Sequence, residues 1–391
     1  HDLLSIFPKN DLFVGALTPL VGDSIFTSHG ERWLRQRKLI DPAFSQMRLN
    51  QAFVEMSAAV DHAEQQLEKL AADHGTFSLD VFASQLTADV ICRTLFSEPL
   101  ASDRARAVFK DFALFERSVA SVNLWQLIFG KPWSDVRQPQ AVLDACERIR
   151  GHIRALLAPR LEGSGTGRDD IVQAIIDARD ETTGQGFSTE ELIDQLGVFF
   201  LAGHETTASA LTWCFYILSQ QPEALARLRR EIAEQVGNGP IDFAAVKQLR
   251  FTRSLFREVL RLYPPITFIP RVAAETVRIA GTRIKKGAMV MISPWATHRN
   301  ALLWRDADRF DPERFMNEKA AESRGSSFLS FGLGPRVCVG AGFATVEATL
   351  ILARLARRFD FLPLAPERVR PVARLTTRPA VEIESRVSVC S

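Results

Sequence analysis

One long apolar segment does most to limit what this chain can fold into. The residues from Leu196 to Leu218 are numerous enough to cross a membrane, but His204 and Glu205 stand in their middle, where charge is costly in lipid. Upstream, Ser188 and Glu191 have the spacing of a capping box, which predicts a helix of about 30 residues, roughly 45 Å long. Because this helix is apolar around most of its circumference, we expect it to run buried through the centre of the protein.

Apolar residues recur with mostly helical spacing from about residue 49 to residue 234, a stretch that includes the long apolar segment. Pro222 predicts the start of a further helix that stops at Gly237. Another helix is expected from about residue 251 until Pro264 ends it.

The later part of the chain has a different pattern. Residues 277–293 alternate around Gly281 and Gly287, as strands joined by tight turns do. We expect a helix near residues 341–359 and short strands in the tail, about residues 369–387. The sequence therefore predicts an α+β fold that is predominantly α-helical, with a large helical region and a small β-sheet region.

Composition excludes several classes of protein. Of the 391 residues, 46% are hydrophobic and 24% charged, which is enough for a sizeable core and unlike a disordered chain. The 48 Lys and Arg against 46 Asp and Glu give no support for nucleic-acid binding. Five scattered cysteines without a CxxC spacing, and no visible signal peptide, predict a reducing compartment and cytoplasmic localisation.

A single cysteine stands in a glycine-rich loop directly before a predicted helix. The loop, residues 328–342, reads FLSFGLGPRVCVGAG, and Cys338 is its cysteine. Glycines let main-chain N–H groups approach the sulfur, and a helix N-terminus favours a thiolate, which suits a metal ligand or a nucleophile. An inert buried thiol in a turn is the alternative.

The pattern around Cys338 resembles the haem-binding loop of the cytochrome P450 family, with Phe331, Gly334, Arg336 and Gly340 at the family's positions. The resemblance implies that Cys338 is the axial thiolate ligand of the iron of haem b, with O2 as co-substrate. It also implies that Phe331 packs near the sulfur and that Arg336 pairs with a haem propionate.

Two further motifs resemble segments of the same family. Glu258 and Arg261 form an ExxR pair on one face of a helix, and Arg314 lies in a segment similar to the family's PxRF. The resemblance implies a buried network of these three residues that locks the loop carrying Cys338. The alternative for the ExxR pair alone is an ordinary surface ion pair.

The long helix holds another motif, from Ala202 through Gly203 to Glu205 and Thr206. Thr206 is able to bond the carbonyl of Ala202, which bends a helix and opens a groove, and Gly203 is expected to leave space beside the haem. The resemblance implies that dioxygen sits in this groove and that Glu205 and Thr206 deliver protons to it. A polar kink in a core helix is the alternative.

Three residues nearer the surface are candidates for holding the haem propionates. Trp33 and Arg37 are four residues apart, like the family's WxxxR, and Arg271 matches another propionate-binding position. For Arg37 the alternative is a solvated basic helix face. The resemblance spans nearly the whole chain and implies one catalytic domain over residues 1–391. It departs at the start, because only 32 residues precede Trp33, so we expect the family's usual N-terminal segment to be missing, and no membrane anchor is visible.

The substrate and the electron source are the least constrained features. An apolar pocket is expected, and each of its candidate wall residues is equally compatible with ordinary core: Leu17, Leu20, Phe26, Phe199, Phe200, Ala202, Ile266, Thr267, Phe268, Leu375 and Thr376. No dinucleotide, flavin or iron–sulfur motif is visible, so electrons are expected from a separate ferredoxin, flavodoxin or reductase. Basic residues that would steer an acidic donor, unless they only form a mixed-charge surface, are Arg32, Arg35, Lys38, Arg324 and Arg336.

The resemblance thus predicts an external haem-thiolate monooxygenase that inserts one oxygen atom from O2 into an apolar organic substrate by hydroxylation or epoxidation. One alternative is the same fold driven by peroxide, against which the Glu205–Thr206 pair argues. The other is a non-catalytic haem protein.

Overall fold

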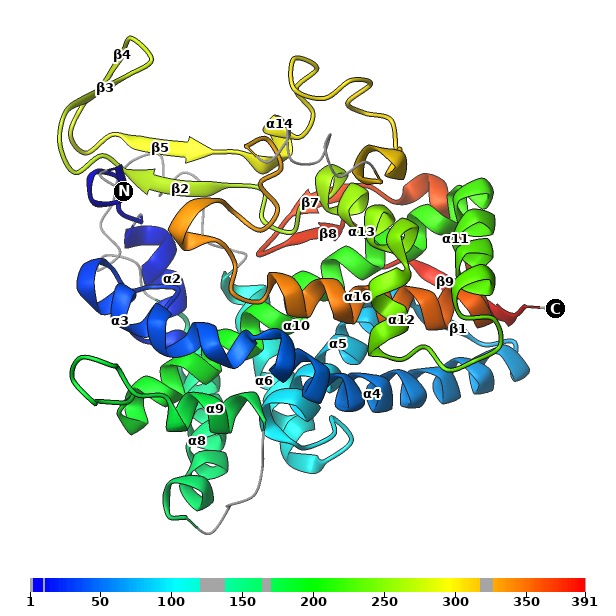
Figure 1. The fold of residues 1–391 in the computed structure, drawn as a ribbon, viewed down its shortest axis with the longest axis horizontal. Coiled ribbons are helices and arrows are strands. Elements are labelled where there is room, and N and C mark those ends of the chain that lie inside the picture. The colour runs from blue at the N-terminus through cyan, green and yellow to red at the C-terminus, as the bar shows by residue number, and fades with distance from the viewer. Residues whose placement is uncertain (1–2, 10, 120–137, 164–169, 317–325, 391) are drawn as a thin grey trace. The chain divides into compact units, whose positions relative to one another are not determined.

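The computed structural model describes residues 3–9, 11–119, 138–163, 170–316 and 326–390, which form two compact units. The first unit is His1–Ala43, Ala101–Ala202 and Phe268–Ser293, and the second is Phe44–Leu100, Gly203–Thr267 and Pro294–Ser391. Helices dominate, and the described strands pair only antiparallel (Figure 1). The predicted α+β, predominantly helical class is confirmed.

The first unit is mostly helical with two antiparallel strand pairs. In it α8 packs against α2 and α6, while β2 pairs with β5 and β3 with β4. Gly281 and Gly287 both have φ of +81°, the left-handed conformation that tight turns require. Its elements are α1 (Leu3–Ile6), α2 (Asp11–Val21), α3 (Gly30–Ile40), α6 (Asp103–Val119), α8 (Gln140–Leu161), α9 (Ile171–Asp177), β2 (Ile269–Val272), β3 (Val277–Ile279), β4 (Thr282–Ile284) and β5 (Met289–Ile292).

The second unit contains the element that follows the cysteine loop, α16, which packs against α4, α11 and α13. A three-stranded sheet has the order β1-β9-β6, and β7 and β8 form a separate hairpin (Figure 1). Its elements are α4 (Gln46–Ala72), β1 (Thr76–Ser78), α5 (Leu79–Phe96), α11 (Pro222–Gln235), α12 (Phe243–Gln248), α13 (Arg250–Leu262), α14 (Pro294–Thr297), α16 (Ala341–Arg358), β6 (Phe359–Pro363), β7 (Pro371–Ala373), β8 (Thr377–Pro379) and β9 (Glu384–Val389).

The predicted long helix is α10 (Thr189–Gln220), an unbroken helix of 32 residues. Its capping box is formed as expected, because the Ser188 N–H donates to the Glu191 carboxylate (2.8 Å) and the Glu191 N–H to the Ser188 hydroxyl (3.3 Å). The division between the two units falls within this helix, after Ala202. Among the described residues, no helix combines the length and apolarity that crossing a membrane requires.

Candidate functional site

Cys338 lies in a tightly folded loop before α16. Gly332 and Gly334 have φ of +75° and +70°, so the loop takes two turns that other residues would adopt only with strain. The Cys338 N–H donates to the Phe331 carbonyl (2.8 Å), and a short 3-10 helix, Gly334–Arg336, fills the loop between them. Gly340 precedes α16, and a Cβ built there would be 3.9 Å from the Cys338 sulfur. The loop therefore presents the thiol from a defined main-chain position.

Cys338 is also the most exposed of the five cysteines, all of which the structure describes. Cys338 is exposed, whereas Cys92, Cys146 and Cys214 are buried and Cys390 is partly buried. Burial raises the pKa of the Cys92 and Cys214 thiols, and that of Cys146 to about 12. Since a metal ligand has to be a thiolate that the metal can reach, Cys338 is the cysteine that fits haem iron.

Glu258, Arg261 and Arg314 form a buried ion network in the same unit as this loop. Glu258 on α13 accepts hydrogen bonds at 2.7 Å from both Nε and Nη2 of Arg261. The Arg314 Nε lies 3.3 Å from the same carboxylate, and the Asp311 N–H donates to it at 2.9 Å. Burial by itself raises the pKa of the Glu258 carboxyl, and these donors oppose that rise.

Arg261 has a partner for each of its five donors. Besides the two bonds to Glu258, Nη1 donates to the carbonyls of His298 (2.8 Å) and Ala307 (2.5 Å), and Nη2 to that of Arg309 (3.0 Å). The Arg314 Nη2 donates to the Asp306 carbonyl (2.8 Å). The network therefore fixes the main chain between His298 and Arg314, and it is fully buried at Glu258 and Arg261.

His298 connects that network to the cysteine loop. Its Nε2 accepts from the Leu329 N–H (2.8 Å), so Nδ1 carries the proton and donates to the Arg261 carbonyl (2.9 Å). The Ser330 hydroxyl donates to the Leu260 carbonyl (2.8 Å), which gives the loop a second tie to α13. Burial lowers the pKa of His298 to about 4, so it is neutral at pH 7. Sequence reasoning missed His298, because both partners of its imidazole ring are main-chain groups.

On α10, Glu205 is bound to the β7–β8 hairpin. The Thr376 hydroxyl (2.6 Å) and the Arg378 Nε (3.0 Å) donate to one carboxylate oxygen, and the Arg378 Nη2 donates to the other. Burial raises the pKa of this carboxyl, but Arg378 outweighs it, and the pKa lies below the ordinary value. Glu205 is therefore an anion, and its partner Arg378 was not among the residues expected from the sequence.

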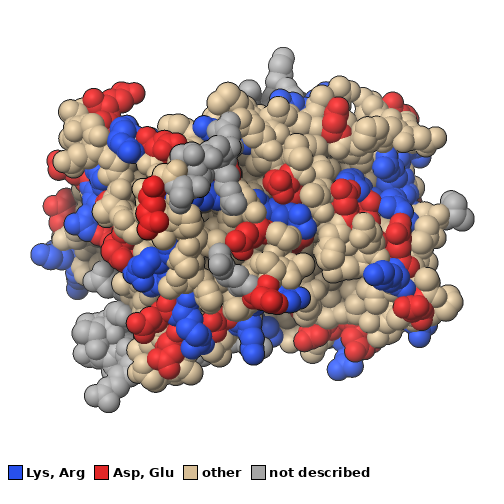
Figure 2. Space-filling view, turned by 90° about the horizontal axis from the view of Figure 1, so that it is seen from below, with Lys and Arg blue, Asp and Glu red and all other residues tan. Residues whose placement is uncertain are grey.

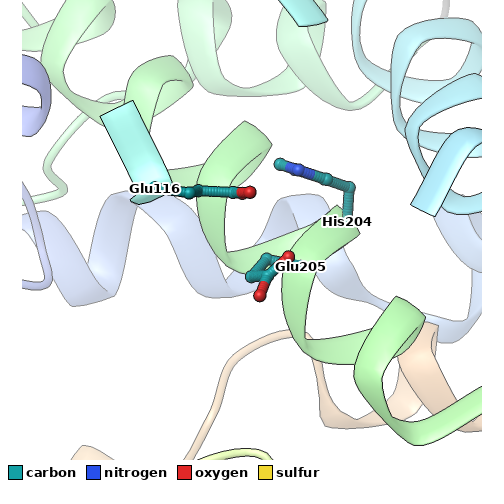
Figure 3. Close-up of side chains that lie close together, drawn as sticks. All are labelled: Glu116, His204 and Glu205. Atoms are coloured by element: carbon teal, nitrogen blue, oxygen red, sulfur yellow. The ribbon is translucent and has the colours of Figure 1, made fainter. Parts of the chain in front are cut away.

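The neighbours of Glu205 differ in their surroundings. Figure 3 shows the side chains of His204 and Glu205 where they leave α10, and both residues are buried. The His204 carbonyl accepts from the Thr87 hydroxyl on α5 (3.0 Å). A Cβ at Gly203 would lie 2.5 Å from Cδ1 of Ile91, so the glycine allows α5 to approach α10 closely. Ala202 is exposed within an otherwise buried stretch of α10, and Thr206 is half-buried.

The propionate candidates of the first unit are placed on α3 and β2. Trp33 is buried, and the Arg37 Nε lies 2.6 Å from the Asp41 carboxylate. Arg271 is half-buried and donates to its neighbouring carbonyl, that of Pro270 (2.8 Å). Within the described parts of the chain it has no carboxylate at ion-pair distance, and burial lowers the pKa of its guanidinium. A half-buried cation of this kind fits an anionic group such as a propionate.

The apolar candidates divide into packed and accessible residues. Leu17, Leu20, Phe199 and Phe200 are buried, and Phe200 stacks on Phe112 with ring centroids 4.1 Å apart, as core residues do. The candidates with accessible surface are Phe26, Ile266, Thr267, Phe268 and Leu375. Thr376 is buried against Glu205.

Of the basic residues considered for donor docking, the three on α3 differ in their pairing. Arg32 pairs with Asp23, and Arg35 with Glu191 at 2.7 Å, whereas Lys38 is exposed. Acidic and basic side chains are interspersed over the face drawn in Figure 2. Arg324 lies outside the described residues.

Comparisons with known proteins agree on one family. The family model "Cytochrome P450" matches residues 7–384. The chain is 33% identical to cyclooctatin synthase of Streptomyces melanosporofaciens, over 90% of this chain and 76% of that protein. It is 31% identical to pentalenene oxygenase of Streptomyces avermitilis, over 95% and 81%.

A crystal structure of a cytochrome P450, CYP102L1, has the same fold. It superposes with a TM-score of 0.85 at 22% identity and covers 99% of this chain and 86% of that one. Proteins of this family generally carry a haem-thiolate cofactor and use an external redox partner. The chain belongs to the cytochrome P450 family and is a P450 monooxygenase.

Proposed function

We propose that this monooxygenase transfers one oxygen atom of O2 to an apolar organic substrate, that Cys338 is its haem ligand and that residues 1–391 act as one catalytic domain. The observation that carries the proposal is the exposed thiol of Cys338 on a loop tied to α13 through His298 and Ser330. When bound, the haem supplies O2 activation and oxygen transfer, and thiolate ligation favours O–O cleavage.

The remaining candidate residues hold the cofactor. Arg271 offers a half-buried charge without a described acidic partner, which supports a role in binding a propionate. Arg336, Trp33 and Arg37 are proposed to bind propionates as well, and Arg37 would then exchange Asp41 for the cofactor. The Phe331 carbonyl accepts from the Cys338 N–H, and the Phe331 side chain is proposed to shield the sulfur.

Proton supply is the second requirement of this chemistry. One oxygen atom enters the substrate and the other leaves as water, which consumes two protons and two electrons for each O2. Glu205 and Thr206 are adjacent on α10, and the accessible Ala202 lies one helical turn before Thr206 on the same face. We propose that the Thr206 hydroxyl donates a hydrogen bond at the O2 site and that Glu205 supplies the protons that the reaction consumes there.

Electrons are proposed to come from a separate protein of ferredoxin, flavodoxin or reductase type. The sequence has no flavin, dinucleotide or iron–sulfur motif in its 391 residues. The scattered cysteines support a reducing compartment such as the cytoplasm.

Replacing Thr206 tests the proton-supply proposal. In Thr206→Ala, product formation per O2 consumed should fall by about 10²-fold, with hydrogen peroxide in its place, because the hydroxyl no longer holds the proton donor. The control is Thr212→Ala, which removes a buried hydroxyl bonded to the Ala208 carbonyl at 2.8 Å on the same helix. Unchanged coupling in Thr206→Ala would move proton delivery to another residue.

The substrate class is best tested by spectral titration of the ferric protein. The names of two relatives, pentalenene oxygenase and cyclooctat-9-en-7-ol 5-monooxygenase, supply the first compounds for an apolar library. A compound that displaces the iron's water ligand shifts the spin state and becomes a turnover candidate. If no apolar compound in the library produced a shift, the proposed substrate class would be wrong.

A further inference from the structure

Two adjacent side chains of α10 hold the main chain between α2 and α3, in residues 22–28, which we call the 22–28 segment. The Asp194 carboxylate accepts from the Asp23 N–H (2.9 Å), and the Gln195 side-chain carbonyl accepts from the Ile25 N–H (3.0 Å). Both side chains are buried, so water competes little for these bonds. Two successive residues of one helix therefore fix alternate residues of a segment that contains no helix or strand.

The segment is shaped to fit the Asp194 carboxylate. Gly22 has φ of +45°, and a Cβ at this position would clash with the carboxylate, so a larger residue would disturb the contact. Arg150 on α8 donates to the same carboxylate (2.6 Å) and to the Leu20 carbonyl of α2 (3.2 Å). Asp194 thus joins α8, α10 and the 22–28 segment at one charged group.

Gln36 on α3 fixes the segment from another element. Its Nε2 donates to the Asp23 carbonyl (2.7 Å), and its Oε1 accepts from the Ser28 hydroxyl (2.6 Å). Gln36 is fully buried. Together with the two bonds from α10, these contacts hold the main chain on both sides of Phe26.

Burial in the 22–28 segment is the reverse of the ordinary pattern. Three hydroxyl side chains are at most 5% exposed: Ser24, Thr27 and Ser28. The apolar side chains of Ile25 and Phe26 are only half-buried. Since apolar groups are ordinarily the buried ones, this inversion indicates that Ile25 and Phe26 belong to an apolar binding surface.

The helix that holds the segment also carries part of the site proposed for O2. Ala202, which is exposed within a buried stretch of α10, follows Gln195 by about two helical turns. The two residues therefore lie on one face of the helix, about 10 Å apart along its axis. Because α10 is one unbroken helix, the bonds from Asp194 and Gln195 set where the segment stands relative to that face.

We propose that Asp194 and Gln195 are positioning residues that set the substrate range of this enzyme by holding Ile25 and Phe26 as a fixed apolar wall. The wall contacts the part of the substrate that is remote from the reacting carbon. The class that it selects is extended apolar molecules that span the distance of about 10 Å from Ala202, rather than small hydrocarbons. This inference rests on the apolar substrate and the O2 site of the proposed function.

The test uses the haem-loaded ferric protein and two iron-binding probes of different length, imidazole and 1-dodecylimidazole. Binding of either probe shifts the Soret band, so each Kd is obtained without turnover. Gln195→Leu leaves the Ile25 N–H without its acceptor. In this variant the Kd of 1-dodecylimidazole should rise about tenfold, because binding must then also order the segment, and that of imidazole should change by less than about twofold.

Three further measurements separate positioning from a general loss of structure. Asp194→Asn retains an oxygen for the Asp23 N–H and should have a smaller effect than Asp194→Ala, and this pair also serves if Gln195→Leu does not fold. Gln138→Leu removes a bond to the Ala16 carbonyl of α2 (2.9 Å) and should leave both Kd values unchanged. Hydrogen exchange of residues 22–28 should be faster in Gln195→Leu than in the wild type.

A double-mutant cycle with Phe26→Ala tests whether Gln195 acts through the wall. Phe26→Ala alone should weaken 1-dodecylimidazole binding, and adding Gln195→Leu to it should weaken binding by much less than tenfold further. Independent effects of the two substitutions would contradict the proposal.

Two other results would overturn it: equal weakening of both probes in Gln195→Leu, or an unchanged Kd of 1-dodecylimidazole in a Gln195→Leu protein whose 22–28 amides exchange faster. The readout uses no O2, no substrate and no electron donor. A failure of the monooxygenase proposal would appear in turnover and in the carbon monoxide spectrum, and so would be distinguishable.

Discussion

Glu258 and Glu205 are both buried against arginines, and their surroundings differ. Around Glu258, the two arginines bind five main-chain carbonyls as well as the acid, and every donor of Arg261 is used. Around Glu205, one arginine and one threonine from a short hairpin bind the acid. The arginines around Glu258 are held in place by main-chain carbonyls of the folded chain. Among the described residues, Glu205 is bound only by side chains, which can change rotamer without moving the main chain.

This difference assigns the two regions to different tasks. The Glu258 network holds the segment that follows α14 and, through His298, the loop of Cys338. The Glu205 pair lies on α10 next to Thr206, where the proposed chemistry requires an acid whose proton content changes. A buried ion pair is by itself weak evidence for stability, so the partners decide what it does.

The largest effect is expected when the same conservative substitution is made in both regions. Arg261→Lys replaces five donors in a planar fork by three on one nitrogen and leaves carbonyls and part of Glu258 unpaired, so the free energy of unfolding should fall by about 3–5 kcal/mol. Arg378→Lys keeps a charge opposite Glu205 and should cost about 1 kcal/mol. Denaturant unfolding measures both, and equal losses would remove the distinction.

A second prediction tests whether His298 joins the Glu258 network to the loop of Cys338. The pKa of His298 falls from 6.5 to about 4 on folding, so below pH 6.5 the unfolded chain binds a proton that the folded chain does not. Stability should therefore drop as the pH falls from 6.5 to 4, by about 1.4 kcal/mol per pH unit and about 3 kcal/mol in all.

In His298→Ala this acid-dependent loss should disappear, and stability at pH 7 should be lower because Leu329 and Arg261 lose a partner. His62→Ala, an exposed control on α4, should keep the wild-type pH profile. If stability depended on pH in His298→Ala as it does in the wild type, protonation of His298 would not be the cause of the loss of stability in acid.

The smallest effect is expected at another buried glutamate, Glu347, which has no arginine as a partner among the described residues. Glu347 on α16 is fully buried, and neither oxygen has a hydrogen-bond partner among the described residues. Burial raises its pKa well above 4.5, and the nearby Thr207 on α10 opposes that rise without cancelling it. Above pH 4.5 the folded chain thus binds a proton that the unfolded chain releases, and stability falls as the pH rises.

Glu347→Gln should remove this slope. Its stability relative to the wild type should rise with pH above 4.5, by about 1.4 kcal/mol for each pH unit over which Glu347 keeps its proton in the folded wild type. Glu64→Gln is a control at a buried glutamate that has charged partners. Glu64 binds Arg354 at 2.6 Å and Arg358 at 2.7 Å, so losing both charge pairs should lower the stability at neutral pH. Parallel pH profiles of Glu347→Gln and the wild type would mean that Glu347 is ionised in the folded protein.

The sequence predicted what local patterns encode. The capping box of Ser188, the start of α11 at Pro222 and the turns at Gly281 and Gly287 are visible as spacing or residue type, and each is present in the structure. The motif residues around Cys338 and Glu258 were also identifiable, because their order resembles a family.

Partners fixed by tertiary contact could not be predicted. His298 binds main-chain groups, Arg378 meets Glu205 from 173 residues away, and Glu347 looks like any helix glutamate until α10 covers it. A Cβ at Gly203 would meet Ile91 of α5, a neighbour that the sequence did not indicate. In each case the sequence gives the residue type but not the neighbour that decides its chemistry.

The most direct test of the account is the absorption spectrum of the reduced, carbon monoxide-bound protein. With Cys338 as the thiolate ligand, the wild type should absorb at the long-wavelength position that marks thiolate-ligated haem, and Cys390→Ser should do the same. Cys338→Ser should lose that band. A wild-type band at the position of histidine or neutral ligation, or a thiolate band that survives in Cys338→Ser, would contradict the assignment of Cys338.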